Sequence, residues 1–265
     1  MKNQISPLPP KSTKWAVFLD LDGTLFGEGH TIPQRNLDAI AAARAKGHLI
    51  LVNTGRSLGH VPAVVTEDLV CDGIITGNGA MITMGDAVLQ DAFMPPSLIG
   101  RVADYVFGNK DCWALFEGKY QTYALTNGIR PQKPGQIPID APKDLEQFCS
   151  GDRIQVIALG KTAPQEFIAQ FREELTVIQF ENYADVSMKG ITKATGMEKV
   201  LSAVGIDRAH SIAIGDSGND RAMLEYAGIG IAMANSEKAL LKAADDITAS
   251  NLDCGVANAI EKYLL

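Results

Sequence analysis

Two aspartates, Asp20 and Asp22, are the residues of this 265-residue sequence with the clearest capacity for chemistry. They follow an apolar run at residues 15–19 that predicts a buried strand, and Gly23 and Thr24 then indicate a turn. Two carboxylates this close cannot both stay ionised without a cation or a shared proton. Oxygen ligands suit magnesium, and ligands bind at the carboxyl ends of parallel strands. We therefore predict a Mg²⁺ site at this strand end.

A capped turn is the alternative interpretation of this stretch, because aspartate before glycine is common in turns. That interpretation accounts for one of the two acids. It leaves the other unexplained at the end of an apolar strand, so we favour a functional site.

Thr54 occupies the equivalent position on the next predicted strand. Helical spacing of apolar residues predicts a helix from Pro33 to Gly47, and residues 48–53 read as a strand, which together form a right-handed βαβ unit. The Thr54 hydroxyl and the Gly55 amide could donate to a phosphate oxygen, although a threonine here could also simply cap a helix. Arg56 could recruit an anion or form a surface ion pair.

Two further strand ends carry polar side chains. A short strand at residues 74–76 ends before Asn78, which lies in a Gly-Asn-Gly turn that could also be a hairpin. A core-type strand at residues 211–214 leads into a glycine-rich turn with Asp216, Asn219 and Asp220. One acid of that turn could cap a helix, but two acids with an asparagine between them suggest oxygen ligands for a metal.

Lys193 opens a predicted helix, where the helix dipole disfavours a cation. Something in the structure should therefore compensate for this unfavourable position. Lys189, four residues earlier, is the rival for this role, and a solvated surface lysine is the alternative for both.

The pattern of expected secondary structure changes between residues 84 and 189. Strands at 112–116 and 119–125 flank a hairpin at Gly118, and further strands are expected at 154–159, 176–180 and 183–188, with a helix near 164–174. The proline- and glycine-rich residues 126–150 predict irregular structure. We interpret this as an α+β module inserted into an α/β domain of residues 14–83 and 190–265, with residues 1–13 as a flexible tail.

These motifs resemble those of the haloacid dehalogenase superfamily. The run Asp20-Leu21-Asp22-Gly23-Thr24 resembles its first motif, Thr54 its second, Lys193 its third and Gly215 to Asp220 its fourth. Thr54-Gly55-Arg56, an Asn-Gly-Ala at Asn78 and the sequences at residues 232–235 and 253–257 further resemble the Cof-type branch. The resemblance covers nearly all of residues 14–265, and it implies a Rossmann-like doubly wound parallel sheet with an inserted type-2 cap.

The resemblance also implies roles for the residues. Asp20 is implied as the nucleophile, Asp22 as the general acid and base, and Lys193 as the cation that neutralises nucleophile and phosphate. The implied metal ligands are Asp20, the Asp22 carbonyl and Asp216, with Asp220 nearby or bound through water. Thr54, Gly55, Arg56, Asn78 and Asn219 are the expected substrate-binding residues.

We therefore expect a magnesium-dependent phosphatase that acts on a small phosphorylated metabolite, most readily a sugar phosphate, through an aspartyl-phosphate. A phosphatase for pyridoxal phosphate or flavin mononucleotide and a phosphomutase of the same fold are the alternatives. A metabolite-binding relic would need a missing chemical residue, and none is missing. Specificity should reside in the cap, where Glu117, Tyr120 and Tyr123 are candidates.

The net charge and the hydropathy of the sequence exclude some classes of binding partner. The net charge of −7 argues against nucleic acid, and no apolar run is long enough to cross a membrane. The residues before Lys14 lack the apolar region of a signal peptide, and four widely spread cysteines indicate reduced thiols. We expect a cytoplasmic protein, and the sequence names no protein partner.

Overall fold

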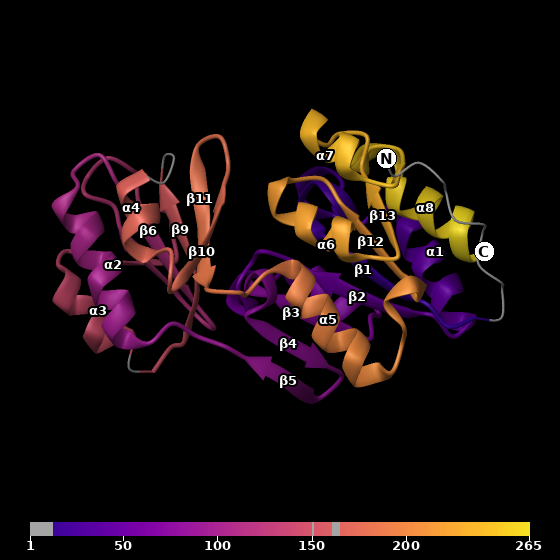
Figure 1. The fold of residues 1–265 in the computed structure, drawn as a ribbon, viewed down its shortest axis with the longest axis horizontal. Helices are drawn as coiled ribbons and strands as arrows, with labels where there is room; N and C mark the ends of the chain where they lie inside the picture. Colours follow the sequence, from indigo (N-terminus) through magenta and orange to yellow (C-terminus); the bar gives the residue numbers. More distant parts are fainter. Residues whose placement is uncertain (1–12, 150, 161–164) are drawn as a thin grey trace.

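The structure, a computed structural model, describes residues 13–149, 151–160 and 165–265. The expected tail at residues 1–13 lies almost entirely outside these ranges. The described residues form two sheets, each with its own helices, and Figure 1 shows them side by side. The expected α/β architecture with an inserted second unit is confirmed.

The first sheet has eight strands in the order β14-β13-β12-β1-β2-β3-β4-β5. The six strands from β14 to β3 are parallel, and β4 and β5 add an antiparallel hairpin at one edge. Its strands are β1 (Ala16–Leu19), β2 (Leu49–Asn53), β3 (Gly73–Thr76), β4 (Met81–Met84), β5 (Ala87–Asp91), β12 (Ser211–Gly215), β13 (Ile229–Ala232) and β14 (Asp246–Ile247). The central strands are apolar except for Asn53 and Ser211 at strand ends, because both of their faces are covered.

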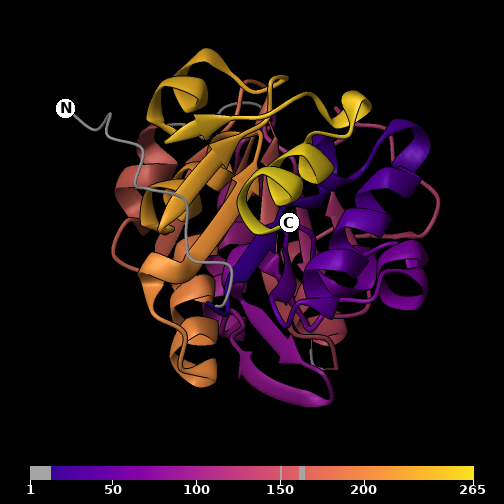
Figure 2. The same cartoon turned by 90° about the vertical axis from the view of Figure 1, so that its right-hand side faces the viewer.

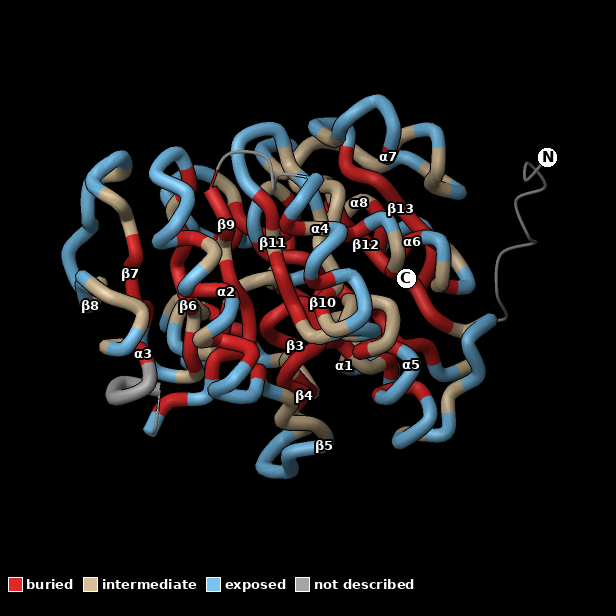
Figure 3. The backbone as a smooth tube through the Cα atoms, turned by 60° about the vertical axis from the view of Figure 1, so that its left-hand side comes forward, coloured by how far each residue is buried: buried red, intermediate tan, exposed pale blue. Residues whose placement is uncertain are grey.

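Helices cover the two faces of this sheet, as Figure 2 shows. On one face α1 (Gln34–Ala45) and α8 (Gly255–Leu264) pack on Val17, Ile50 and Ile212. On the other face, α5 (Lys193–Val204), α6 (Arg221–Tyr226) and α7 (Lys238–Ala243) pack on Phe18 and Leu51. Alternate residues of one strand thus enter different cores. Figure 3 shows the strands in the middle of the molecule as buried.

The second sheet has six strands in the order β10-β11-β9-β6-β7-β8. We call it the cap sheet. Its strands are β6 (Ala114–Gly118), β7 (Thr122–Leu125), β8 (Gln136–Pro138), β9 (Ile154–Gly160), β10 (Leu175–Gln179) and β11 (Tyr183–Met188). Three helices, α2 (Pro96–Gly108), α3 (Pro142–Cys149) and α4 (Gln165–Phe171), belong to this unit, and side chains of all three share its apolar core with one face of the cap sheet.

Two details differ from the sequence-based expectation. The expected boundary at residue 84 falls inside the β4–β5 hairpin, so residues 87–91 belong to the first sheet and the elements of the second unit begin with α2. The segment expected to be irregular, residues 126–150, contains β8 and the whole of α3. Pro142 does not prevent α3, because proline is tolerated in the first turn of a helix.

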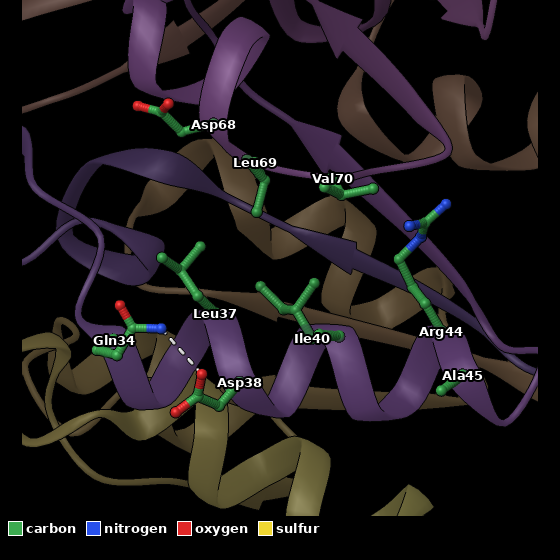
Figure 4. A pocket seen from close by; sticks show the side chains of 10 residues that line it. Gln34, Leu37, Asp38, Ile40, Arg44, Ala45, Asp68, Leu69 and Val70 are labelled. Carbon is green, nitrogen blue, oxygen red and sulfur yellow. Dashed lines mark hydrogen bonds between the residues drawn. The ribbon is translucent and has the colours of Figure 1, made fainter.

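A surface groove of about 530 Å³ lies between α1 and the segment 68–70, as Figure 4 shows. Its floor is apolar, with Leu37, Ile40 and Leu69, and Gln34 donates a hydrogen bond to Asp38 at its edge. It is separate from the strand ends that carry the predicted site residues. Within the described ranges, no helix combines the length and the apolar character needed to span a bilayer.

Asp72 fixes the start of β3 against β2 and α1. Its carboxylate accepts hydrogen bonds from the Ile50 amide (2.8 Å) and from Arg44 Nε (3.1 Å) and Nη2 (2.9 Å). Burial raises the pKa of Asp72, but the hydrogen bonds from Arg44 and Ile50 outweigh it, so the pKa lies below its ordinary value.

We predict that Asp72→Asn lowers the free energy of unfolding at pH 7 by about 1–3 kcal/mol, because it removes a charged acceptor from a partly buried pair. A carboxyl with a depressed pKa stabilises the fold above its unfolded-state pKa and loses that effect as the pH falls through the folded-state pKa. Urea denaturation should therefore show the difference between the two proteins at pH 7 and a smaller one near pH 3. An equal difference at both pH values would contradict this account.

Candidate active site

Four neighbouring parallel strands, β12, β1, β2 and β3, deliver the predicted residues to one edge of the first sheet. Asp20 follows β1 directly, Thr54 follows β2, Asn78 follows β3 and Asp216 follows β12. Because parallel strands end on the same side, the loops after them converge there. The structure thus brings together residues that are up to about 200 positions apart in the sequence.

Lys193 lies at the centre of this edge, with its side chain fully buried. Its Nζ atom is 2.5 Å from Asp20 Oδ1 and 2.6 Å from Asp220 Oδ1. Burial lowers the pKa of Lys193, but the two carboxylates outweigh it and raise the pKa above its ordinary value. The partner that a cation at a helix N-terminus requires is therefore a pair of buried acids.

Asp20 is buried among other acids. Burial and the charge of Asp220 raise its pKa well above the ordinary value, and Lys193 counteracts them. Burial and Asp220 also raise the pKa of Asp216, to about 6. The carboxylates of Asp20, Asp216 and Asp220 repel one another in this buried place. A divalent cation bound between them would remove that repulsion.

Asp216 is held by the turn that follows β1. Thr24 Oγ1 donates a hydrogen bond of 2.9 Å to Asp216 Oδ1. A Cβ atom on Gly23 would lie 2.3 Å from Asp216 Oδ2, and Gly23 also has a positive φ of 76°. Only glycine satisfies both conditions, so the turn at Gly23 packs closely against Asp216 in the loop after β12.

Asp220 organises the loop after β12. Its Oδ2 atom accepts hydrogen bonds from the amides of Asp216 (2.9 Å) and Ser217 (3.0 Å), while Oδ1 faces Lys193. Both oxygens therefore have protein donors. This arrangement positions Lys193 and Asp216 and agrees with an indirect place for Asp220 at a metal site.

Asp22 and Arg56 form a bidentate ion pair, with Arg56 Nε 2.6 Å from Oδ2 and Nη2 2.6 Å from Oδ1. The Arg56 side chain is 25% exposed and that of Asp22 is 49% exposed. Arg56 also donates to the His60 carbonyl at 2.9 Å. Of the two sequence-based alternatives for Arg56, the structure shows an ion pair, and it lies beside the site.

A line of polar groups crosses from the first sheet to the cap sheet above Gly55. Asn219 Nδ2 donates to Asn78 Oδ1 (3.2 Å), and Asn78 Nδ2 donates to Asp185 Oδ2 on β11 (3.1 Å). A Cβ atom on Gly55 would lie within 3.4 Å of all three side chains. Thr54 beside it is buried, and its hydroxyl accepts from the Arg56 amide, which leaves the hydroxyl hydrogen available to donate.

The donor set fits a hard cation. Asp20, Asp216 and Asp220 each offer an oxygen, and these three oxygens lie within 4.8 Å of one another. Lys193 is the buried cation that pairs with two of these acids, so negative charge exceeds positive charge. Oxygen ligands and excess negative charge are the conditions under which proteins bind hard divalent cations.

All residues predicted for the site lie at this edge, but sequence reasoning missed two of its members. Thr24 was part of the first motif but was not assigned to the site, and Asp185 was not singled out. Of the three cap candidates, Glu117 faces the first unit, where its Oε2 atom is 3.9 Å from His60 Nδ1. Tyr123 packs instead in the apolar core of the cap unit, and Tyr120 is 62% exposed.

Comparison with known proteins identifies the family of this chain. The sequence model of one family, described as haloacid dehalogenase-like hydrolase, matches residues 17–260. The putative phosphatase YxeH of Bacillus subtilis is 26% identical over 94% of this chain and 98% of its own length. A phosphoglycolate phosphatase of Methanococcoides burtonii is 29% identical over 94% of this chain and 96% of its own length.

Among solved structures, the subclass IIB sugar phosphatase BT4131 is 25% identical and superposes with a TM-score of 0.79, covering 95% of this chain and 99% of that one. The chain belongs to the haloacid dehalogenase-like hydrolases. The resemblance seen in the sequence is therefore confirmed, and the phosphatase relatives support the expected class, a phosphoric monoester hydrolase.

We predict that Lys193→Met lowers the free energy of unfolding by about 3–5 kcal/mol in buffer with EDTA, because it leaves Asp20 and Asp220 buried without their cation. Lys189→Met is the matched control, since Lys189 is exposed and its Nζ contacts only the Arg172 carbonyl among the described residues. Urea denaturation of both variants measures the difference. Equal stability of the two variants would show that the buried pair does not hold this edge together.

Proposed function

We propose that this chain is a magnesium-dependent phosphatase that hydrolyses small phosphorylated metabolites, sugar phosphates first among them, through an aspartyl-phosphate on Asp20. One observation carries the proposal. Asp20 is buried at a strand end, one of its oxygens is fixed 2.5 Å from Lys193, and Asp216 and Thr54 come from the adjacent strands. The family and the similarity to a sugar phosphatase support the same reaction and substrate class.

In the first half of the proposed reaction, an Asp20 oxygen attacks phosphorus and the bond between phosphorus and the leaving oxygen breaks. Asp22 gives its proton to that oxygen, which leaves as an alcohol. Lys193 and the Thr54 hydroxyl stabilise the charge on the phosphoryl oxygens. Mg²⁺, held by Asp20, Asp216 and the Asp22 carbonyl, would offset the charge of the carboxylates and orient the phosphate.

In the second half, Asp22 takes a proton from water, and the water oxygen attacks phosphorus. Phosphate is released and the Asp20 carboxylate is regenerated. Arg56 holds both oxygens of Asp22 in this structure, so it fixes the orientation of the acid. For proton transfer, one of the two hydrogen bonds from Arg56 must break, so that the freed oxygen of Asp22 can bond to the leaving oxygen of the substrate or to water.

We predict that Asp20→Asn lowers phosphate release by a factor on the order of 10³ or more, because an amide cannot act as the nucleophile. Asp68→Asn is the control, since Asp68 is an exposed acid beside the groove on α1. Phosphate release from a panel of sugar phosphates, with product analysis, is the measurement. Substantial turnover by Asp20→Asn would refute the mechanism, and a phosphorylated isomer as the product would indicate a mutase.

We further predict that excess EDTA abolishes phosphate release and that added Mg²⁺ restores it, because the acidic cluster needs a cation to accept a phosphate. Initial rates before and after addition of the metal test this. Full activity in EDTA would contradict the assignment of the metal.

A further inference from the structure

The cap sheet has one face that its helices leave bare. Phe116 and Tyr123 of the β6–β7 hairpin, with Ile157 of β9 and Val186 of β11, point into the apolar core that the helices share. Side chains alternate along a strand, so their neighbours point the other way. Glu117 and Asp185 are among these neighbours, and we call the surface they belong to the bare face.

The bare face lies against the loops that carry the candidate active site. His60 of the first unit shares a hydrogen bond of 2.6 Å with Thr122 of β7, and Ser57 shares one of 2.7 Å with the same imidazole. On the other side, Asn78 bonds Asp185 of β11. A phosphate beside Thr54 and Asp20 would therefore present its leaving group to this face.

Two acids mark the bare face. Glu117 has a side chain that is 20% exposed, and burial raises its pKa to about 7 against hydrogen bonds from Ser57. Burial likewise raises the pKa of Asp185, to about 6, and the charge of Glu117 contributes to that shift. Asp185 Oδ2 accepts from Asn78, and among the described residues no donor is bonded to Asp185 Oδ1. That oxygen can accept a hydrogen bond from a ligand.

The cations around the two acids already have partners. Arg56 is held by Asp22 in a bidentate pair, and Lys193 lies between Asp20 and Asp220. Arg130, which also influences Glu117, lies 4.8 Å from the Trp113 ring and donates to Gln136. Burial and the charge of Arg56 lower the pKa of His60, which favours its neutral form.

Aromatic and small side chains complete the bare face. The Trp113 ring lies where a Cβ of Gly160 would be, which fills that position of β9. Tyr183 pairs with Gly160 in the sheet and stacks on Phe180, with ring centroids 4.6 Å apart. Ala158 pairs with both Leu115 and Asp185, so a small apolar patch adjoins the acids. Apolar surface beside carboxylate acceptors suits the C–H and O–H groups of a polyol.

We propose that Glu117 and Asp185 determine specificity by accepting hydrogen bonds from an uncharged polyhydroxyl leaving group and by disfavouring leaving groups that carry a carboxylate or a second phosphate. This inference rests on the proposed phosphatase function and narrows it. A hydroxyl can donate to either acid. At pH 8, above the raised pKa values of both acids, a carboxylate at the same place would meet two negative charges while the nearby cations are engaged elsewhere, and burial strengthens the repulsion.

Matched substrate pairs test the proposal. Glycerol 3-phosphate and 3-phosphoglycerate differ mainly in a hydroxymethyl group against a carboxylate, and sorbitol 6-phosphate and 6-phosphogluconate differ in the same way. At pH 8, where both acids are ionised, we expect the wild-type protein with Mg²⁺ to prefer the alcohol of each pair by at least about 10-fold in kcat/KM, as repulsion worth about 1.4 kcal/mol would give. Equal use of both members by the wild type would overturn the proposal, even if no variant folds.

The isosteric variants Asp185→Asn and Glu117→Gln remove the charge and keep the shape. Each should reduce the preference for the alcohol at least about 3-fold, by weaker use of the alcohol and better use of the carboxylate. Asp104→Asn, an exposed acid on α2, is the control and should leave the preference unchanged. An unchanged preference in both folded variants would also overturn the proposal.

The same assay separates this proposal from the proposed phosphatase function. If the wild type hydrolyses neither substrate pair nor p-nitrophenyl phosphate, the phosphatase function itself fails. If it hydrolyses them without discriminating alcohol from carboxylate, only the selection by Glu117 and Asp185 fails.

Discussion

The arrangement of this site depends on one lysine buried between two aspartates. Lys193 has no exposed side-chain surface, and it lies within 2.6 Å of both Asp20 and Asp220. Neither acid could be buried at this strand end without a cation, and the lysine could not be buried without them. Asp220 in turn fixes the loop amides that position Asp216, and Thr24 holds Asp216 from the opposite side. The ion pairs of Lys193 with Asp20 and Asp220 thus connect α5 to the loops that follow β1 and β12.

The two units of the fold contribute different chemistry. The first supplies acids, a hydroxyl and a lysine from loops that the parallel sheet brings to one edge, and these groups suit phosphoryl transfer. The cap sheet contributes no group to the Lys193 cluster but places Asp185 and Glu117 beside it. The cap acids would add to the negative charge of the site, which is why we connect them with the choice of leaving group and not with binding of phosphate.

Much of the core could be predicted because its signals are local. Apolar strands that end in polar residues identified β1, β2, β3 and β12, and a lysine in an unfavourable place on a helix indicated that something compensates for its charge, without identifying the two acids. The cap was harder. Strand β5 lies at an edge with exposed Val88 and Leu89, so its pattern resembles that of a cap strand, and only its pairing with β4 assigns it to the first sheet. Tyr123 was misjudged because the side of a sheet that a residue faces depends on hairpin register, which pairs Glu117 with Thr122. Asp185 carried no local signal, since its partner Asn78 is 107 residues away.

The chain returns from β11 to the first unit immediately before Lys193, and Thr192 and Thr195 close a reciprocal cap at the start of α5. Lys193 lies between these two threonines, so the start of α5 is anchored within its own first turn. The lysine is also fixed by acids that belong to the first unit alone. Under the proposed function, mutational drift in the inserted unit can therefore alter which metabolite is recognised without breaking the ion pairs of Lys193, and the architecture makes the two properties separately evolvable.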